Sequence, residues 1–364
     1  MSRNFLIKLK ANSKLLHIVS VRRCCTSPKN GFTVTVLDGC HKVGRHTALI
    51  LKQSPLISEL RLHDIDSTIC FVAEDLSHID TRTKVKSFCG QSVLKNAVAD
   101  ADIVVCLGGC RSKISETCKD LFEKNVDAVR TAAWHCIEFS PKAIFCIAKP
   151  PIEAFVPLVT EEYKKAGVHD YRKIIGISSV ACMRSNSFIG LISGQDSSQV
   201  RCPVVGGASK GCVVACISQT KPEQVHPQHH KIIQDSIAIS EDEVLKAYHN
   251  RGTSCLAAAL AISRFVNCQL KALNGETNCV DCAFVKQTGH IGQFLPYMTS
   301  IVRLGRHGLL SAHMPKINGY EAHCLKRAAL YIKDYIKLGE TFVTGERKGI
   351  KEIKSEITKA VKCN

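Results

Sequence analysis

The sequence has no run of about 18 consecutive apolar residues, the length that a membrane-spanning helix needs, so it predicts no membrane span. Aromatic residues make up only 6% of the 364 residues. A nucleic-acid-binding surface combines clustered basic residues with a recognisable motif or aromatic side chains, and neither is present. The net charge of +17 therefore predicts no nucleic-acid partner. The length suits about two domains.

No acidic residue precedes Asp38, whereas residues 1–37 contain seven lysines and arginines. Lysines interrupt the apolar core that a secretory signal would need. The basic, serine-containing, acid-free composition predicts a mitochondrial transit peptide over residues 1–28, and hence a location in the mitochondrial matrix. A disordered basic arm is the alternative. Residues 344–364 form a basic C-terminal tail, either the frayed end of a helix or a docking arm.

The 20 cysteines lack the pattern of a disulfide scaffold. They are scattered through apolar segments of a long chain, where free cysteine behaves as a small hydrophobic residue. Cys279 and Cys282 form a C-x-x-C pair, but no second pair at zinc spacing accompanies it and an apolar strand-like segment follows. The sequence therefore predicts no metal site.

Short apolar segments alternate with helical segments through the first half of the chain. This alternation predicts an α/β fold with a doubly wound parallel sheet of the Rossmann type, as a dinucleotide-binding domain over residues 31–177. The expected strands are 32–37, 60–65, 103–107 and 143–148, with helices over 47–52 and 120–139.

The second half predicts a mixed α+β substrate domain over residues 178–343. Helices are expected over 184–191 and 321–338, a strand over 200–205, and alternating segments between 280 and 303. The apolar stretch 212–218 fits either a strand or the start of a buried helix. A long helical region over 241–266 is expected to break near Gly252.

A glycine-containing turn follows the first expected strand, where a Rossmann sheet binds a pyrophosphate against a helix N-terminus. Gly39 and Gly44 lie in this turn, and Asp64 follows 20 residues after Gly44. Asp64 can accept a hydrogen bond from an adenosine ribose, or it is an ordinary cap at the end of a strand. Asp38 places a carboxylate where phosphate would bind. We therefore expect NAD as the cofactor, with weakened binding.

Several segments between Thr33 and Val343 resemble the mitochondrial-type malate dehydrogenases, of the lactate/malate dehydrogenase family. The similar segments are 51–56 (LKQSPL), 75–79 (DLSHI), 184–188 (RSNSF), 203–207 (PVVGG) and 338–343 (LGETFV). The resemblance implies an NAD-linked malate/oxaloacetate oxidoreductase that forms a homodimer. In the glycine pattern of this family, only Gly44 is in register, and Gly39 is displaced by one position.

The resemblance also implies a proton-exchanging histidine paired with an orienting aspartate, and both positions are changed. The histidine position falls on Ala208 and the aspartate position on Ala181. Loss of such an acid–base group costs on the order of 10²–10⁴-fold in rate. Lys149 or Lys210 is a candidate substitute base if burial favours its neutral form.

Other family positions are partly kept. Of three substrate-binding arginines only Arg184 matches; the two on the family's lid fall on Ser112 and Cys118, with Arg111 as a possible substitute. Arg184 fits a buried ion pair equally well. An asparagine position that contacts substrate and cofactor falls on Lys149. Among cofactor-contacting positions, Asn125 and Ile147 match and a methionine position falls on Ala258.

The resulting hypothesis is a pseudoenzyme: a malate dehydrogenase fold, catalytically dead or strongly impaired, that forms a homodimer or a heterodimer with an active paralogue. A small dicarboxylate is a candidate ligand. One alternative is an active NAD-dependent malate or related 2-hydroxy acid dehydrogenase that uses a substitute base. A structural protein is the other.

Overall fold

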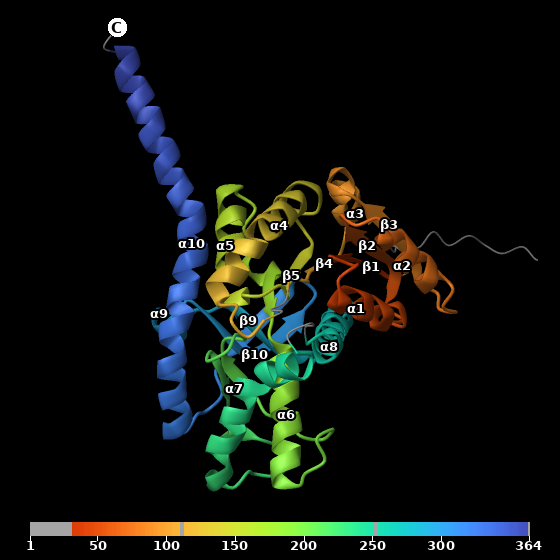
Figure 1. The fold of residues 1–364 in the computed structure, drawn as a ribbon, viewed down its shortest axis with the longest axis vertical. Coiled ribbons are helices and arrows are strands. Elements are labelled where there is room, and N and C mark those ends of the chain that lie inside the picture. Colours follow the sequence, from red (N-terminus) through yellow and green to blue (C-terminus); the bar gives the residue numbers. More distant parts are fainter. Residues whose placement is uncertain (1–30, 110–112, 250–253, 363–364) are drawn as a thin grey trace, which may run out of the picture. The chain divides into compact units, whose positions relative to one another are not determined.

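The computed structural model describes residues 31–109, 113–249 and 254–345 in full, and the helical backbone of 346–362. The predicted transit peptide and Arg111, Ser112 and Gly252 lie outside the described residues. A single sheet runs through both halves of the described chain (Figure 1). The predicted boundary at 177/178 therefore stays a prediction.

The first half forms the predicted parallel sheet. Its strands are β1 (Phe32–Leu37), β2 (Ile57–Asp64), β3 (Lys84–Cys89), β4 (Ile103–Cys106), β5 (Ile144–Ile147) and β6 (Ile174–Ile177). They lie in the order β3-β2-β1-β4-β5-β6, each parallel to its neighbours. The order reverses between β1 and β4, and open sheets of this kind bind ligands outside that point. The predicted α/β fold is confirmed.

Helices cover both faces of this sheet (Figure 1). In the first half they are α1 (Lys42–Lys52), α2 (Thr68–Ser77), α3 (Leu94–Val98), α4 (Cys118–Phe139) and α5 (Ile152–Lys165). Phe122 of α4 stacks on Phe155 of α5 at 5.3 Å between ring centroids, in the core of one face. Leu51 of α1 and Ile69 of α2 are fully buried in the core of the other face.

The second half adds antiparallel strands to the β6 edge. The strands are β7 (Val204–Gly206), β8 (Val213–Ala215), β9 (Val280–Lys286), β10 (Tyr297–Gly305) and β11 (Gly308–His313). β9 pairs with β6, and β10 joins β9, β7 and β11. The stretch 212–218 therefore contains a strand, β8. The expected strand 200–205 is shorter than predicted, because Arg201 makes only an isolated bridge to Lys221 before β7 begins.

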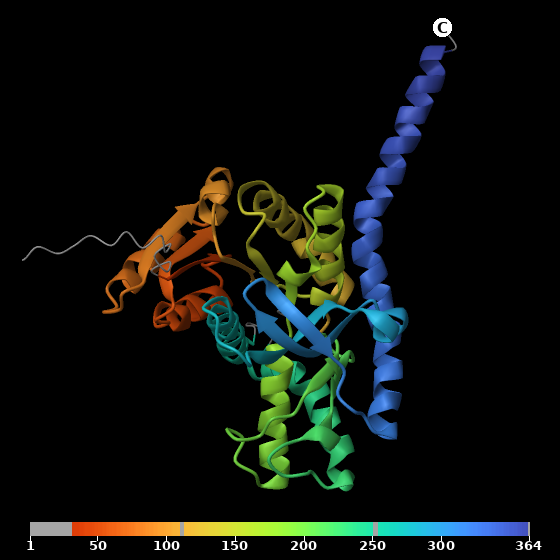
Figure 2. The same ribbon diagram turned by 180° about the vertical axis from the view of Figure 1, so that it is seen from behind.

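The helices of this half are α6 (Ser179–Ser193), α7 (His230–Ala247), α8 (Leu256–Leu273), α9 (Gly289–Phe294) and α10 (Gly319–Lys362). The helical region predicted over 241–266 is two helices, α7 and α8. α10 is much longer than the predicted 321–338, and its backbone continues into the basic tail. Figure 2 shows α10 from behind.

α8 is the one helix in the described part of the chain that is long and apolar enough to cross a membrane. Half of its apolar window is buried against the rest of the protein. Ala259, Phe265 and Val266 are completely buried in the same core as Leu51. Because a core helix of a soluble protein has the same length and composition, α8 is weak evidence for a membrane span.

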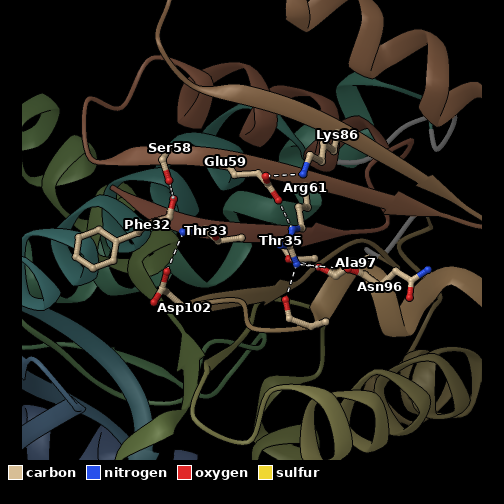
Figure 3. Close-up of polar contacts among 11 residues, drawn as sticks. Phe32, Thr33, Thr35, Ser58, Glu59, Arg61, Lys86, Asn96, Ala97 and Asp102 are labelled. Carbon is tan, nitrogen blue, oxygen red and sulfur yellow. Dashed lines mark hydrogen bonds and ion pairs between the residues drawn. The ribbon is translucent and has the colours of Figure 1, made fainter. Parts of the chain in front are cut away.

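Polar side chains fix the outer strands of the first half (Figure 3). The Arg61 guanidinium of β2 donates to the Glu59 carboxylate and to the carbonyl oxygen of Ala97. Lys86 of β3 pairs with the same carboxylate at 2.7 Å. The Thr35 hydroxyl of β1 donates to the Ala97 carbonyl at 2.7 Å. These bonds join three strands to one another and to the end of α3.

Candidate functional site

The two alanines at the family's acid–base positions line one small cavity. Ala181 lies in the first turn of α6, and Ala208 follows β7. They share a cavity of about 20 Å³ with Arg184, Ser209, Lys210 and Glu241. This is room for about one water molecule. The structure thus brings together the predicted positions 181, 184 and 208, and no imidazole is among the described residues that line the cavity.

Arg184 is the charged group of this cavity. It lies one turn after Ala181 on α6, and its Nη2 donates to the Ser254 hydroxyl at 3.1 Å. Burial lowers the pKa of the Arg184 guanidinium, and the nearby Glu241 carboxylate opposes that shift. The guanidinium therefore has a hydrogen-bond partner in the chain itself and a carboxylate nearby.

A carboxylate missed by the sequence analysis holds the loop that carries Ala208. Glu153 of α5 is fully buried. Its Oε1 accepts the backbone N–H groups of Ala208 and Ser209, each at 2.7 Å, and its Oε2 accepts the Ser209 hydroxyl at 2.8 Å. Glu153 is not among the residues that line the cavity shared by the two alanines. With three donors bound, this carboxylate acts as an anchor for the loop.

Both candidate substitute bases donate to carboxylates. Lys149 is buried and pairs with Asp38, and Lys210 pairs with Asp242. An ammonium group has no lone pair and accepts no proton. Each lysine would have to leave its partner and lose a proton before it could serve as a base.

The glycine turn keeps the backbone path of a Rossmann loop despite its changed residues. A Cβ added at Gly44 would lie 2.3 Å from the carbonyl oxygen of Asp38, so glycine is required where α1 crosses the turn. The Gly39 N–H donates to the His63 carbonyl at 3.0 Å. Asp38 has φ +55°, a left-handed conformation that aspartate tolerates better than most residues.

The N–H groups around this turn are bound by the chain's own side chains. Asp64 ends β2, and its Oδ2 accepts the Cys40 N–H at 2.8 Å. His41 caps α1, and its Nδ1 accepts the Val43 N–H at 3.3 Å. Burial lowers the pKa of His41, which favours the neutral imidazole that can act as this acceptor. Asp64 thus has the geometry of a cap within the turn.

These contacts decide how the turn suits a dinucleotide. A pyrophosphate needs unpaired N–H groups and no negative charge at the start of α1. Here two of the N–H groups are already bound, and the Asp38 carboxylate lies beside the turn in an ion pair with Lys149. In this arrangement the bound N–H groups and the Asp38 carboxylate oppose a pyrophosphate.

The remaining predicted positions are structural in their contacts. Asn125 of α4 donates through Nδ2 to the carbonyl oxygens of Gly109 and Pro150, at 3.0 and 3.1 Å. Ile147 is completely buried in β5, and Ala258 of α8 is partly buried and packs against the core that contains Leu51. Cys118 begins α4, where burial raises the pKa of its thiol. Arg111 and Ser112 lie outside the described residues.

The described cysteines are free thiols, and most are buried. Burial raises the pKa of Cys106 and of Cys146 to about 12, so both stay protonated at neutral pH. The Cys282 thiol shares a hydrogen bond with Cys182. Within the described ranges, no group of three or more His, Cys, Asp or Glu side chains is placed to hold a metal ion.

Two sequence profiles match the chain over nearly the whole described region. The lactate/malate dehydrogenase NAD-binding domain matches residues 33–176, and the α/β C-terminal domain of the same family matches residues 181–343. The chain belongs to the lactate/malate dehydrogenase family. It therefore carries the family's NAD-binding type of domain, with the altered turn described above.

Curated relatives support this family membership. The chain is 35% identical to the mitochondrial malate dehydrogenase of Felis catus over 324 residues, which is 88% of this chain and 95% of the relative. The mitochondrial malate dehydrogenase of Sus scrofa shows the same identity and coverage.

Solved structures share the lactate/malate dehydrogenase fold. A lactate dehydrogenase from Cryptosporidium parvum, in complex with lactic acid and NAD, superposes with a TM-score of 0.73 at 17% identity and covers 86% of this chain and 99% of its own. A malate dehydrogenase from Picrophilus torridus gives the same values.

Glu153 and the partners Asp38 and Lys149 are the site residues whose roles the sequence analysis missed. Glu153 lies in an apolar helix without any local signal that its carboxylate is buried. The opposite charges at two changed family positions were the only available signal for the Asp38–Lys149 pair, which joins residues 111 positions apart.

Proposed function

We propose that this member of the lactate/malate dehydrogenase family is a pseudoenzyme, catalytically inactive or strongly impaired in malate/oxaloacetate turnover. The observation that carries the proposal is the pair of methyl groups at positions 181 and 208, in one cavity with Arg184. An alanine can neither accept the hydroxyl proton nor stabilise a charged imidazole. Lys149 and Lys210 both donate to carboxylates, which disfavours the alternative of a substitute base.

The test is reduction of oxaloacetate by NADH with the purified protein, beside an active mitochondrial malate dehydrogenase under the same conditions. We expect turnover lower by at least about 10²-fold. Lys149→Gln and Lys210→Gln serve as variants of the candidate substitute bases. Turnover near that of the active enzyme would contradict the proposal, and its selective loss in one lysine variant would identify the base.

We also propose that NAD binding is weakened, because Asp38 adds a negative charge at the turn and Asp64 is bound to Cys40. For a dicarboxylate we propose weak binding at most. Arg184 is the retained guanidinium, and it is half-buried in the lining of a cavity of only about 20 Å³. Isothermal calorimetry with malate tests this, and saturable binding that is lost in Arg184→Gln would contradict it.

For partner and location we propose a mitochondrial matrix protein that forms a homodimer or a heterodimer with an active paralogue. The curated relatives are mitochondrial enzymes. Leu49 of α1 and Leu256 of α8 are 43% and 62% exposed on two helices that pack together, and they offer apolar surface to a partner. Sedimentation and organelle fractionation with protease protection test the two statements, and a monomer or a cytosolic pool would contradict them.

A further inference from the structure

An ion pair crosses the carboxyl ends of three neighbouring strands in the first half of the sheet. Asp38 directly follows β1, and Lys149 lies two residues after β5. β4 lies between these strands. The Lys149 ammonium donates to Asp38 Oδ2, and the lysine side chain is only 4% exposed. The pair therefore joins the two sides of the point at which the strand order reverses.

The Asp38 carboxyl group fills the space immediately beyond β4. A Cβ added at Gly108, two residues after β4, would lie 2.6 Å from Asp38 Oδ2 and 2.9 Å from Asp38 Cβ. In a doubly wound sheet, ligands bind in the crevice outside the strand ends at this reversal. The ion pair and a ligand in that crevice would compete for the same place.

The turn itself is not collapsed. Gly44 still permits the close crossing of α1 over the Asp38 carbonyl, and Asp38 keeps a left-handed backbone that the turn requires. The Gly39 N–H still donates to the His63 carbonyl oxygen near the end of β2. The backbone path is present, and side chains obstruct it.

We propose that the Asp38–Lys149 ion pair is an internal latch that closes the dinucleotide crevice, and that these two side chains, rather than a lost backbone shape, are the main cause of the weak affinity for dinucleotides. This inference rests on the weakened NAD binding proposed above and assigns most of it to two residues. Opening the latch separates a buried ammonium from its counter-charge. Because the Asp38 side chain is 36% exposed, breaking the pair costs less than breaking a fully buried one, and we expect it to reduce affinity on the order of 10²-fold.

The test uses the full chain and NADH as the probe, titrated by fluorescence and by calorimetry. The double variant Asp38→Gly/Lys149→Asn removes both charges, so the net charge is unchanged. We expect it to bind NADH at least about 10²-fold more tightly than the wild type. Asp38→Asn keeps the shape and the left-handed backbone, and we expect an intermediate gain. If that double variant is unstable, Asp38→Asn/Lys149→Gln removes both charges, keeps both side-chain shapes and leaves no unpaired buried charge.

The matched control is Lys231→Gln/Asp235→Asn on α7, which removes another lysine–carboxylate pair without changing the net charge. We expect it to leave NADH affinity as in the wild type. Two results would overturn the proposal. One is a micromolar dissociation constant of the wild type for NADH. The other is a folded latch variant that binds NADH no more tightly than the wild type.

Oxaloacetate reduction is measured on the same samples. Turnover by the wild type near that of an active malate dehydrogenase would contradict the proposal that the protein is a pseudoenzyme. Unchanged NADH affinity in the latch variants, without turnover, would contradict the latch alone. The two failures are therefore distinguishable.

Discussion

The backbone of Gly339 in α10 lies directly against the carbonyl oxygen of Ala154 in α5. A Cβ added at Gly339 would be 2.0 Å from that oxygen and 3.2 Å from the Leu158 nitrogen. Both are backbone atoms, so they cannot turn aside as a flexible side chain can. This contact sets how closely α10 packs on the helix that carries Glu153.

We therefore expect Gly339→Ala to destabilise the protein by about 3 kcal/mol, because α5 and α10 must move apart. The matched control is Gly345→Ala in the same helix, where an added Cβ has no neighbour within 4 Å. That change should leave stability unchanged or raise it by about 0.5–1 kcal/mol through helix propensity. Urea unfolding measures both. Equal effects of the two substitutions would argue against this packing.

Glu153→Ala should destabilise the fold by about 2–4 kcal/mol. The substitution leaves the N–H groups of Ala208 and Ser209 and the Ser209 hydroxyl without their acceptor in a buried place. Glu153→Gln keeps an acceptor oxygen for the two N–H groups, and we expect a smaller loss of about 1 kcal/mol. Chemical denaturation gives both values. A Glu153→Ala protein as stable as the wild type would show that the carboxylate does not anchor the loop.

Asp281 of β9 gives a pH dependence with a defined sign. Burial raises its pKa to about 6, whereas an unfolded aspartate titrates near about 3.9. Between these values the folded state binds more protons, so Asp281 makes stability fall as the pH rises from about 4 to 6. The stability lost through ionisation of buried Asp281 is not regained at neutral pH.

We expect Asp281→Asn to be more stable than the wild type at pH 7 by about 1–3 kcal/mol, and equal to it near pH 4. The amide oxygen can still accept from Ser179 Oγ and the Cys282 N–H, as Oδ1 does now. Asp170→Asn is the control of opposite sign, because the Arg172 guanidinium lowers the pKa of Asp170. Urea unfolding at several pH values gives the free energy of unfolding of each variant and of the wild type. An Asp281→Asn variant that is less stable at pH 7 would be inconsistent with the raised pKa.

Restoring the acid–base pair alone should not restore turnover. In Ala208→His/Ala181→Asp the imidazole and carboxylate return, but the Asp38–Lys149 pair still crosses the crevice. We expect measurable oxaloacetate reduction only when Asp38→Gly/Lys149→Asn is added. Assays of the two double variants and of their combination test this order. Activity in Ala208→His/Ala181→Asp alone would count against the latch.

The parallel half of the fold was predictable because its strands are short, apolar and separated by helical segments. Val34, Val104 and Phe145 are completely buried, as their strands predict. β3 was missed because it is an edge strand with the alternating sequence KVKSFC, which buries none of its residues fully. α5 was not distinguished because prolines precede it and Pro157 lies inside it.

The candidate site was predictable only where the family resemblance places a residue. It identified positions 181, 184 and 208, which the structure brings to one cavity. It did not identify Glu153 or the partner of Lys149, because those contacts depend on strand order and helix packing between distant segments. A charged side chain in sequence carries no sign of the group it will meet in the fold.

The bond from the Cys40 N–H to Asp64 has a consequence for the protein without any nucleotide. The amide is held by a carboxylate that is only 8% exposed. Its hydrogen–deuterium exchange should therefore be slow in the ligand-free protein, and added NADH should slow it little further. We therefore expect the turn to gain little rigidity from a cofactor, and maturation of the fold to proceed without a supply of nucleotide.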